Sequence, residues 1–221
     1  MDKIRIVVAD DHAVVREGTR ALLEKEPDMT VVGEAGDGEA AVRLIEELQP
    51  HVAVLDISMP KLSGVEVARR VKAQLPSVAI LILTAYDDDE YIFALLEAGA
   101  AGYLLKDMPS REIIEAIRSV HAGESVLHPS VARKVIQRAV QGASRQQATD
   151  THALISERED EVLKLAAKGL SNQAIAEAMS ISIRTVQGHI NSIFRKMDVG
   201  SRTEAVFKGV KTGLLSFEDI A

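Results

Sequence analysis

Short apolar runs alternate with amphipathic stretches along the first 121 residues of the chain. The runs are rich in Val and Ile and cover residues 4–9, 30–35, 52–55, 78–83 and 102–105. Nearly continuous runs of this kind are typical of parallel strands that are buried on both faces. Apolar side chains at helical spacing occupy the stretches 13–25, 38–48, 64–74, 88–98 and 110–121. The alternation predicts an α/β domain over residues 1–121, with right-handed crossovers and a doubly wound sheet.

The rest of the chain has a different pattern. Residues 122–153 are predicted to be a linker that contains one helix near 129–141, because Pro129 suits a first helical position. Residues 142–153 are small, polar and aperiodic, as in a flexible connection. From residue 154 onward the pattern is purely helical, which predicts a small all-α domain over 154–221.

Serine residues mark where the helices of this second domain begin. Ser156 with Glu159 forms a capping box, and Gly169 ends the helix that follows. The other predicted helices are 172–179 after Ser171, 183–197 after Ser182, and one that reaches about residue 212 after a second capping box, Ser201 with Glu204. We therefore expect four short helices.

The composition narrows the possible classes of protein. The chain has no cysteine, which excludes disulfides and thiolate metal sites. The N-terminus lacks a signal-peptide layout, and no run approaches the roughly 20 apolar residues of a membrane span. We therefore expect a cytoplasmic protein with no membrane partner.

Charge is distributed unevenly along the chain. The net charge is −7, of which residues 1–121 carry −9, whereas residues 154–221 are neutral overall and residues 180–211 within them carry +4. An acidic domain suits a cation and a basic surface suits phosphates, although each bias is also typical of an ordinary solvated surface.

Polar residues follow four of the predicted strands. Asp10 and Asp11 come after the first, Asp56 after the third, Thr84 after the fourth and Lys106 after the fifth. Ligands of open parallel sheets bind beyond the carboxyl ends of the strands, so these side chains are expected to converge. An Asp pair is often only a helix cap, and a lone Lys is often only solvated. The combination instead indicates a Mg²⁺ site with an Asp nucleophile that takes a phosphoryl group.

The segments around these positions resemble the signatures of receiver domains. They read Val8-Ala9-Asp10-Asp11-His12, Val54-Leu55-Asp56-Ile57-Ser58-Met59-Pro60, Ile82-Leu83-Thr84-Ala85 and Gly102-Tyr103-Leu104-Leu105-Lys106-Asp107. The resemblance covers about residues 3–121 and implies a flavodoxin-like, five-stranded parallel sheet in the order 2-1-3-4-5. It implies that Asp56 is the phosphoacceptor. The implied Mg²⁺ ligands are Asp10, Asp11, Asp56 and the main-chain carbonyl of Ser58. Thr84, Tyr103 and Lys106 would form the phosphate switch, and Ser58 and Tyr86 would tune dephosphorylation.

The predicted helix 183–197 has two different faces. One is apolar and belongs to a core, and its members are Val186, Ile190, Ile193, Phe194 and Met197. The opposite face is polar and basic, and its members are Arg184, Gln187, Gly188, Asn191 and Arg195. Such a face suits the major groove of DNA, although a solvated surface would look the same. The preceding short helix completes a helix-turn-helix layout.

Residues 156–206 resemble the LuxR-type DNA-binding domain of the NarL/FixJ response regulators. The matching residues are Arg158-Glu159, Val162-Leu163, Gly169, Ser171-Asn172, Ile175-Ala176, Thr185-Val186, His189, Ile193, Lys196, Val199 and Arg202. The residues expected to contact DNA are Ser182, Arg184, Thr185, Gln187, Gly188, Asn191, Arg195 and Lys196. The chain departs from the family at Ala174, where Glu is usual, and at Gln187, where a basic residue is usual. Gly188 also weakens its helix, by about 0.8–1 kcal/mol relative to Ala.

The two resemblances together imply a response regulator with several partners. These are a sensor histidine kinase, promoter DNA, RNA polymerase and, when phosphorylated, a second copy of the chain, which Val206 and Val210 would contact. Packing within their own domain is the alternative for these valines.

Two other functions stay open. One is a DNA-binding regulator that works without phosphorylation. The other is an aspartyl-phosphate phosphohydrolase, which Ser58 argues against because such enzymes usually place a second Asp there. We expect the protein to have no enzymatic activity beyond its own phosphorylation from a phosphodonor and slow autodephosphorylation.

Overall fold

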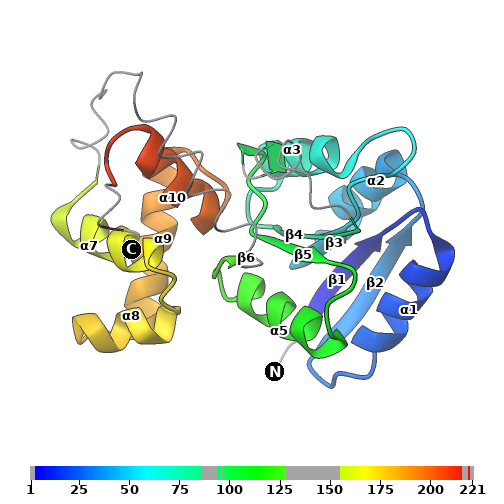
Figure 1. The fold of residues 1–221 in the computed structure, drawn as a ribbon, viewed down its shortest axis with the longest axis horizontal. Coiled ribbons are helices and arrows are strands. Elements are labelled where there is room, and N and C mark those ends of the chain that lie inside the picture. The colour runs from blue at the N-terminus through cyan, green and yellow to red at the C-terminus, as the bar shows by residue number, and fades with distance from the viewer. Residues whose placement is uncertain (1–2, 86–93, 96, 128–154, 216–218, 220–221) are drawn as a thin grey trace.

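The structure is a computed structural model that describes residues 3–85, 94–95, 97–127, 155–215 and 219. An α/β domain and a helical domain lie beside each other (Figure 1). The predicted helix at 129–141 and the predicted connection 142–153 lie outside the described residues, as does most of the helix predicted at 88–98.

Within the described residues, six parallel strands form the sheet, in the order β2-β1-β3-β4-β5-β6. They are β1 (Ile4–Ala9), β2 (Met29–Ala35), β3 (Val52–Leu55), β4 (Ala79–Thr84), β5 (Gly102–Leu105) and β6 (Val126–Leu127). The first five confirm the predicted order 2-1-3-4-5. The last is an addition that the sequence did not predict, in which Val126 pairs with Gly102 and Leu127 with Tyr103. The sheet therefore continues past residue 121, the predicted end of this domain.

Helices cover both faces of the sheet. Helices α2 (Gly38–Leu48) and α3 (Gly64–Gln74) cover one face, and α1 (Ala13–Leu23) and α5 (Ser110–His121) cover the other. Successive strand residues alternate between the two cores, so Val7 and Ile80 pack toward α2 and α3 while Val8 and Leu81 pack toward α1 and α5. Both faces are apolar, which is why the strands read as continuous apolar runs.

The helical domain contains α7 (Glu157–Ala167), α8 (Asn172–Met179), α9 (Ile183–Met197) and α10 (Arg202–Lys211). All four predicted helices are present, and each begins after its predicted serine cap. The second capping box differs from the prediction. The Glu204 carboxylate accepts from the N–H of Gly200 at 2.6 Å instead of that of Ser201. Among the described residues, no helix is both long and apolar enough to cross a membrane.

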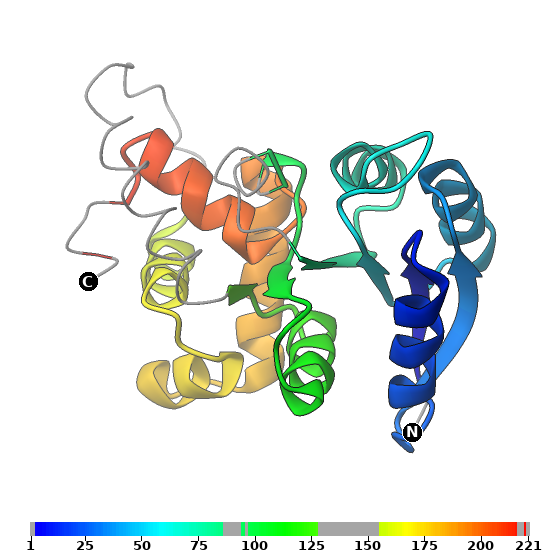
Figure 2. The ribbon, with the colours of Figure 1, turned by 45° about the vertical axis from the view of Figure 1, so that its right-hand side comes forward.

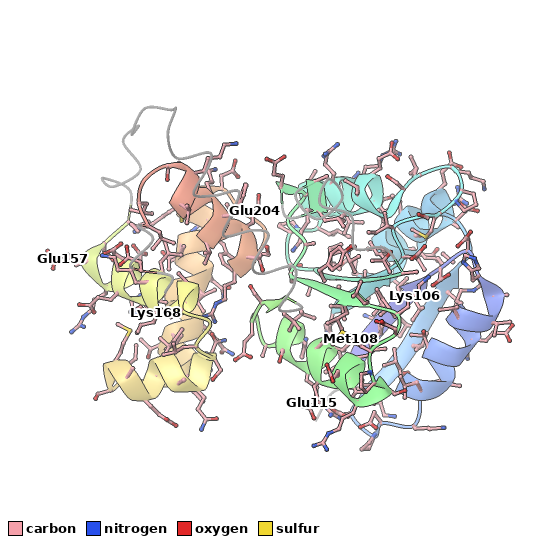
Figure 3. The ribbon with its side chains drawn as sticks, in the orientation of Figure 1. Lys106, Met108, Glu115, Glu157, Lys168 and Glu204 are labelled. Carbon is pink, nitrogen blue, oxygen red and sulfur yellow. The ribbon has the colours of Figure 1, made fainter. Side chains whose placement is uncertain are left out.

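The helical domain contacts the edge at which β4 and β5 begin. Lys72 at the end of α3 donates from Nζ to the carbonyl of Gly200 at 2.7 Å, and the Ser201 hydroxyl donates to the carbonyl of Ala100 at 3.1 Å. In Figure 3, Glu204 lies on the side of the helical domain that faces the sheet, whereas Lys106 lies beyond the far end of β5. The contact between the domains and the predicted phosphoacceptor site are therefore at opposite ends of the parallel strands.

Candidate functional site

Three charged side chains meet at the carboxyl edge of the sheet. Asp10 follows β1, Asp56 follows β3 and Lys106 follows β5, and the two aspartates are 4% and 3% exposed. Lys106 Nζ lies 2.7 Å from Asp10 Oδ2 and 2.9 Å from Asp56 Oδ1. The structure thus brings together three of the residues that the sequence placed at this edge.

The charge of Lys106 is stabilised by its two partners. Burial lowers the pKa of this ammonium group, but its attraction to the Asp10 and Asp56 carboxylates outweighs burial and raises the pKa above its ordinary value. Lys106 therefore stays protonated and compensates part of the negative charge. With Asp11 nearby, carboxylates outnumber the ammonium, so the site can accept a further cation.

The two oxygens of Asp56 have different surroundings. Oδ2 accepts a hydrogen bond from the N–H of Ser58 at 3.0 Å. Oδ1 is buried and, within the part of the chain that the structure describes, it accepts no well-aligned hydrogen bond, although the Lys106 ammonium is close. Oδ1 therefore keeps a lone pair that is available to a metal ion or an electrophile.

Gly64 fixes the backbone behind Asp56. Helix α3 begins at Gly64 behind a complete capping box formed by Ser63 and Glu66, and the N–H of Gly64 donates to the carbonyl of Ile57 at 2.8 Å. A Cβ at position 64 would lie 2.2 Å from the main-chain oxygen of Asp56. The close approach requires glycine, a requirement that sequence reasoning did not identify.

Asp10, Asp11 and His12 form a group that could hold a metal ion. Each offers one ligand atom, and these atoms lie within 4.8 Å of one another. The N–H of His12 donates to Asp10 Oδ1 at 2.9 Å, and His12 Nδ1 lies 2.7 Å from Asp11 Oδ1. The sequence prediction included the two aspartates but not His12. The position of His12 directly after the two aspartates was the sequence feature that could have indicated it as a further ligand.

The predicted switch residues lie close to this edge in the fold. Thr84 ends β4, where it pairs with Leu105, the residue before Lys106, and its side chain is buried. Tyr103 lies within β5 and is 2% exposed, and it packs in the core on the face of the sheet that α2 and α3 cover. Ser58 lies two residues after Asp56 and is exposed. Tyr86 lies outside the described residues.

The residues predicted to contact DNA are exposed on α9 and at its cap. They are Ser182, Arg184, Thr185, Gln187, Gly188, Asn191, Arg195 and Lys196. The opposite face of α9 is buried in the domain core through Val186, Ile190, Ile193 and Met197. The predicted separation of the two faces is therefore present in the structure.

Lys196 has a partner that the sequence did not reveal. Its Nζ donates to Glu159 Oε2 at 2.6 Å, and the Ser192 hydroxyl donates to Glu159 Oε1, also at 2.6 Å. Burial raises the pKa of Glu159, but the bonds from Lys196, Ser156 and Ser192 together lower it to about 2. Glu159 therefore ties α9 to α7 and engages Lys196 away from the Gln187 face.

The polar face of α9 looks toward the sheet domain across a cavity of about 380 Å³. Gln187 and Asn191 line it from α9, and Lys72 and His121 line it from the sheet domain. Figure 2 shows α9 standing beside the end of α5. Gln187 and Asn191 stay exposed to solvent in this arrangement, but the sheet domain lies across the cavity from them and would obstruct a DNA duplex.

The two valines predicted to form a dimer contact occupy different positions on α10. Val210 is buried in the core of its own domain, and Val206 is half-buried against that core. Packing within the domain accounts for Val210, so a contact with a second copy stays a prediction.

Two family models match the chain. The response regulator receiver domain matches residues 6–118, and the luxR family of bacterial regulatory proteins matches residues 153–208. The chain is 39% identical to the transcriptional regulatory protein DegU of Brevibacillus brevis, over 96% of this chain and 95% of that one.

Solved structures match nearly the whole chain. The response regulator ChrA of a heme-sensing two-component system is 37% identical, with a TM-score of 0.53 over 97% of this chain and all of that one. A structure of two RcsB dimers bound to two parallel DNAs is 26% identical, with a TM-score of 0.56 over 95% and 99% of the two chains.

Proposed function

The chain belongs to the two-component response regulators that join a receiver domain to a LuxR-type DNA-binding domain, and we propose that phosphorylation of Asp56 controls its binding to promoter DNA. As a member of this family it regulates transcription and is not a catalytic enzyme. The receiver implies a sensor histidine kinase as partner, which fits a cytoplasmic location, and the helix-turn-helix domain binds DNA.

The observation that carries the proposal is the buried Asp56 carboxylate, whose Oδ1 lies 2.9 Å from the Lys106 ammonium and accepts no well-aligned hydrogen bond among the described residues. Oδ1 attacks the phosphorus of the donor and forms a new O–P bond. The P–N bond to the kinase histidine breaks, and the imidazole leaves with the electron pair and takes up a proton. Lys106, 2.9 Å from Oδ1, then pairs with the phosphoryl oxygens.

The residues at this edge fit Mg²⁺. Asp10 and Asp11 belong to a group that could hold a metal ion, and Asp56 Oδ1 accepts no well-aligned hydrogen bond among the described residues, although Lys106 is close. Together with the main-chain carbonyl of Ser58, these three aspartates would supply the hard oxygen donors that Mg²⁺ prefers. When bound, the ion neutralises charge on the phosphoryl oxygens. Ser58 and Tyr86 would set how quickly water reaches the acyl phosphate.

Strand β5 connects the two ends of the proposed switch. Lys106 follows its last residue, and Ala100, which accepts a hydrogen bond from Ser201 of the DNA-binding domain, lies two residues before its first. A phosphoryl group that reorients Thr84, Tyr103 and Lys106 would shift β5 and so weaken the hydrogen bond between Ser201 and Ala100. We propose that the domains then separate and leave Gln187 and Asn191 accessible to a DNA duplex.

The uncovered domain would bind promoter DNA as a homodimer and act on RNA polymerase. The matched structure that contains two RcsB dimers bound to DNA supports the homodimer. Of the two valines on α10 that were predicted for that contact, we propose Val206, which is half-buried, because Val210 packs in the core of its own domain. Lys196 would contribute less to DNA binding than Arg184 or Arg195, because Glu159 already holds its ammonium group.

Treatment with acetyl phosphate and Mg²⁺ is expected to add one phosphoryl group to the protein. In this reaction the P–O bond to acetate breaks and Asp56 Oδ1 gains the phosphorus. Intact mass spectrometry of the wild-type protein and of Asp56→Ala checks this. The variant should show no gain. An unchanged mass in a folded wild-type protein would instead favour a DNA-binding regulator that works without phosphorylation.

A further inference from the structure

The amino end of α8 is occupied by a carboxylate from the receiver domain. Glu124, between α5 and β6, accepts a hydrogen bond from the N–H of Asn172 at 2.9 Å through Oε1. Asn172 is the first residue of α8, and the preceding Ser171 caps the N–H of Ala174. Because the first N–H groups of a helix have no partner inside it, this end carries partial positive charge that attracts anions.

A buried arginine adds a full positive charge at the same end. Arg202 is 5% exposed, and its guanidinium donates to the carbonyl of Leu170 at 2.5 Å and to Asn172 Oδ1 at 3.5 Å. Burial lowers the pKa of Arg202 to about 10, and the nearby Glu124 carboxylate opposes this lowering. No carboxylate lies within ion-pair distance of Arg202 among the described residues, so Glu124 neutralises its charge only at longer range.

The amino end of α8 shares a surface with the DNA-reading face of α9. Asn172 and Arg202 line the same interdomain cavity as Gln187 and Asn191. In helix-turn-helix domains the first helix crosses the DNA backbone while the second enters the major groove, and helix N-termini are common phosphate ligands. A duplex that meets Gln187 and Asn191 would therefore bring a backbone phosphate to the N–H of Asn172.

We propose that the amino end of α8, together with Arg202, binds a DNA backbone phosphate, and that Glu124 occupies this site in place of the phosphate while the domains are closed. The inference rests on the proposed DNA-binding function. The receiver would then compete directly with DNA, because the site can hold either the Glu124 carboxylate or a DNA phosphate but not both at once. Two pairs of variants test its two halves.

The first pair tests the competition. The probe is a labelled duplex selected from a random pool by the full-length protein after treatment with acetyl phosphate. Glu124→Ala should bind this duplex roughly tenfold more tightly than the wild type when neither is phosphorylated, because the closed state loses a charge-assisted hydrogen bond. Glu115→Ala is the matched control, since Glu115 is exposed on α5 away from the second domain (Figure 3). It should bind as the wild type does. Equal affinities for Glu124→Ala and the wild type would overturn the competition.

The second pair tests the phosphate site. Asn172→Pro and Asn172→Ala both remove the side chain, but only proline removes the N–H. Proline is favoured at the first helical position, and the extended backbone of Ser171 accepts a following proline, so both variants should fold. After phosphorylation, Asn172→Pro should bind the duplex roughly tenfold more weakly than Asn172→Ala.

A third readout distinguishes a lost phosphate contact from a structural effect. Each phosphate of the duplex is replaced in turn by an uncharged methylphosphonate. We expect one position at which this replacement weakens DNA binding by Asn172→Ala but leaves DNA binding by Asn172→Pro unchanged. If the two variants bind equally and no position separates them, α8 holds no phosphate. If no form of the protein selects or binds any duplex, the proposed DNA-binding function itself fails, and the inference fails with it.

Discussion

Replacing Gly64 with alanine is expected to slow phosphorylation of Asp56 by acetyl phosphate about 100-fold. The new Cβ would lie 2.2 Å from the main-chain oxygen of Asp56 and 3.1 Å from the Cα of Ile57, and both neighbours are backbone atoms that cannot rotate away. Helix α3 and the segment after β3 must then separate. A shift of about 1 Å in a reacting group can cost a factor of about 100 in rate. Overpacking against backbone should also lower the free energy of unfolding by about 3 kcal/mol.

Intact mass spectrometry as a function of time measures the rate, and urea unfolding measures the stability. Gly18→Ala is the matched control, because a Cβ on Gly18 in α1 meets no atom within 4 Å. It should keep the wild-type phosphorylation rate and stability, or gain slightly in stability. A wild-type rate in Gly64→Ala would show that the close approach to Asp56 does not position the nucleophile.

Replacing Glu159 with alanine is expected to destabilise the DNA-binding domain by about 3 kcal/mol. Glu159 is 4% exposed and accepts hydrogen bonds from Lys196 and Ser192 of α9, and it completes the capping box with Ser156. Its loss leaves an ammonium and a hydroxyl without their partner and separates α9 from α7. Hydrogen exchange in peptides from α7 and α9 measures the change. Glu161→Ala, which breaks only an exposed pair with Arg158, should cost less than about 0.5 kcal/mol.

The effect of Glu159 depends on pH in a defined direction. Its pKa in the folded protein is lowered to about 2, from 4.5 in the unfolded chain. The carboxylate therefore stabilises the folded domain fully above about pH 4.5, and this contribution is lost as the pH falls from there through about 2. The difference between wild type and Glu159→Ala should shrink over that range. A difference that stays constant would contradict the stabilising role of the ionised carboxylate.

The fold could be predicted from local patterns where those patterns are long. Strands buried on both faces give continuous apolar runs, and serine caps mark the starts of the four C-terminal helices. Strand β6 could not be found in this way, because two residues have no periodicity and Val126 and Leu127 form a strand only by pairing with β5. The partner of Glu204 was misassigned for a related reason: Gly200 and Ser201 both offer an N–H, and the motif does not choose between them.

The cluster of charged side chains at the carboxyl edge could be predicted because the topology of a parallel sheet brings the residues after its strands to one edge. That rule alone predicts that Asp10, Asp56 and Lys106 lie close together. Polar contacts between distant segments leave no such pattern. Glu124 and Asn172 are 48 residues apart, and Glu159 and Lys196 are 37 apart. In the sequence these residues look like ordinary surface charges or helix caps, because nothing local shows which distant residue each will contact. For this reason Lys196 was predicted to contact DNA, and its partner Glu159 was not predicted.

DNA affinity measured before and after phosphorylation tests most directly whether Asp56 controls DNA binding. Fluorescence anisotropy with the selected duplex would compare the wild-type protein with and without acetyl phosphate and Mg²⁺, with Asp56→Ala treated in the same way. We expect phosphorylation to tighten binding by the wild type at least tenfold and to leave the variant unchanged. If the wild type gains the phosphoryl mass but binds the duplex with the same affinity, Asp56 does not control DNA binding.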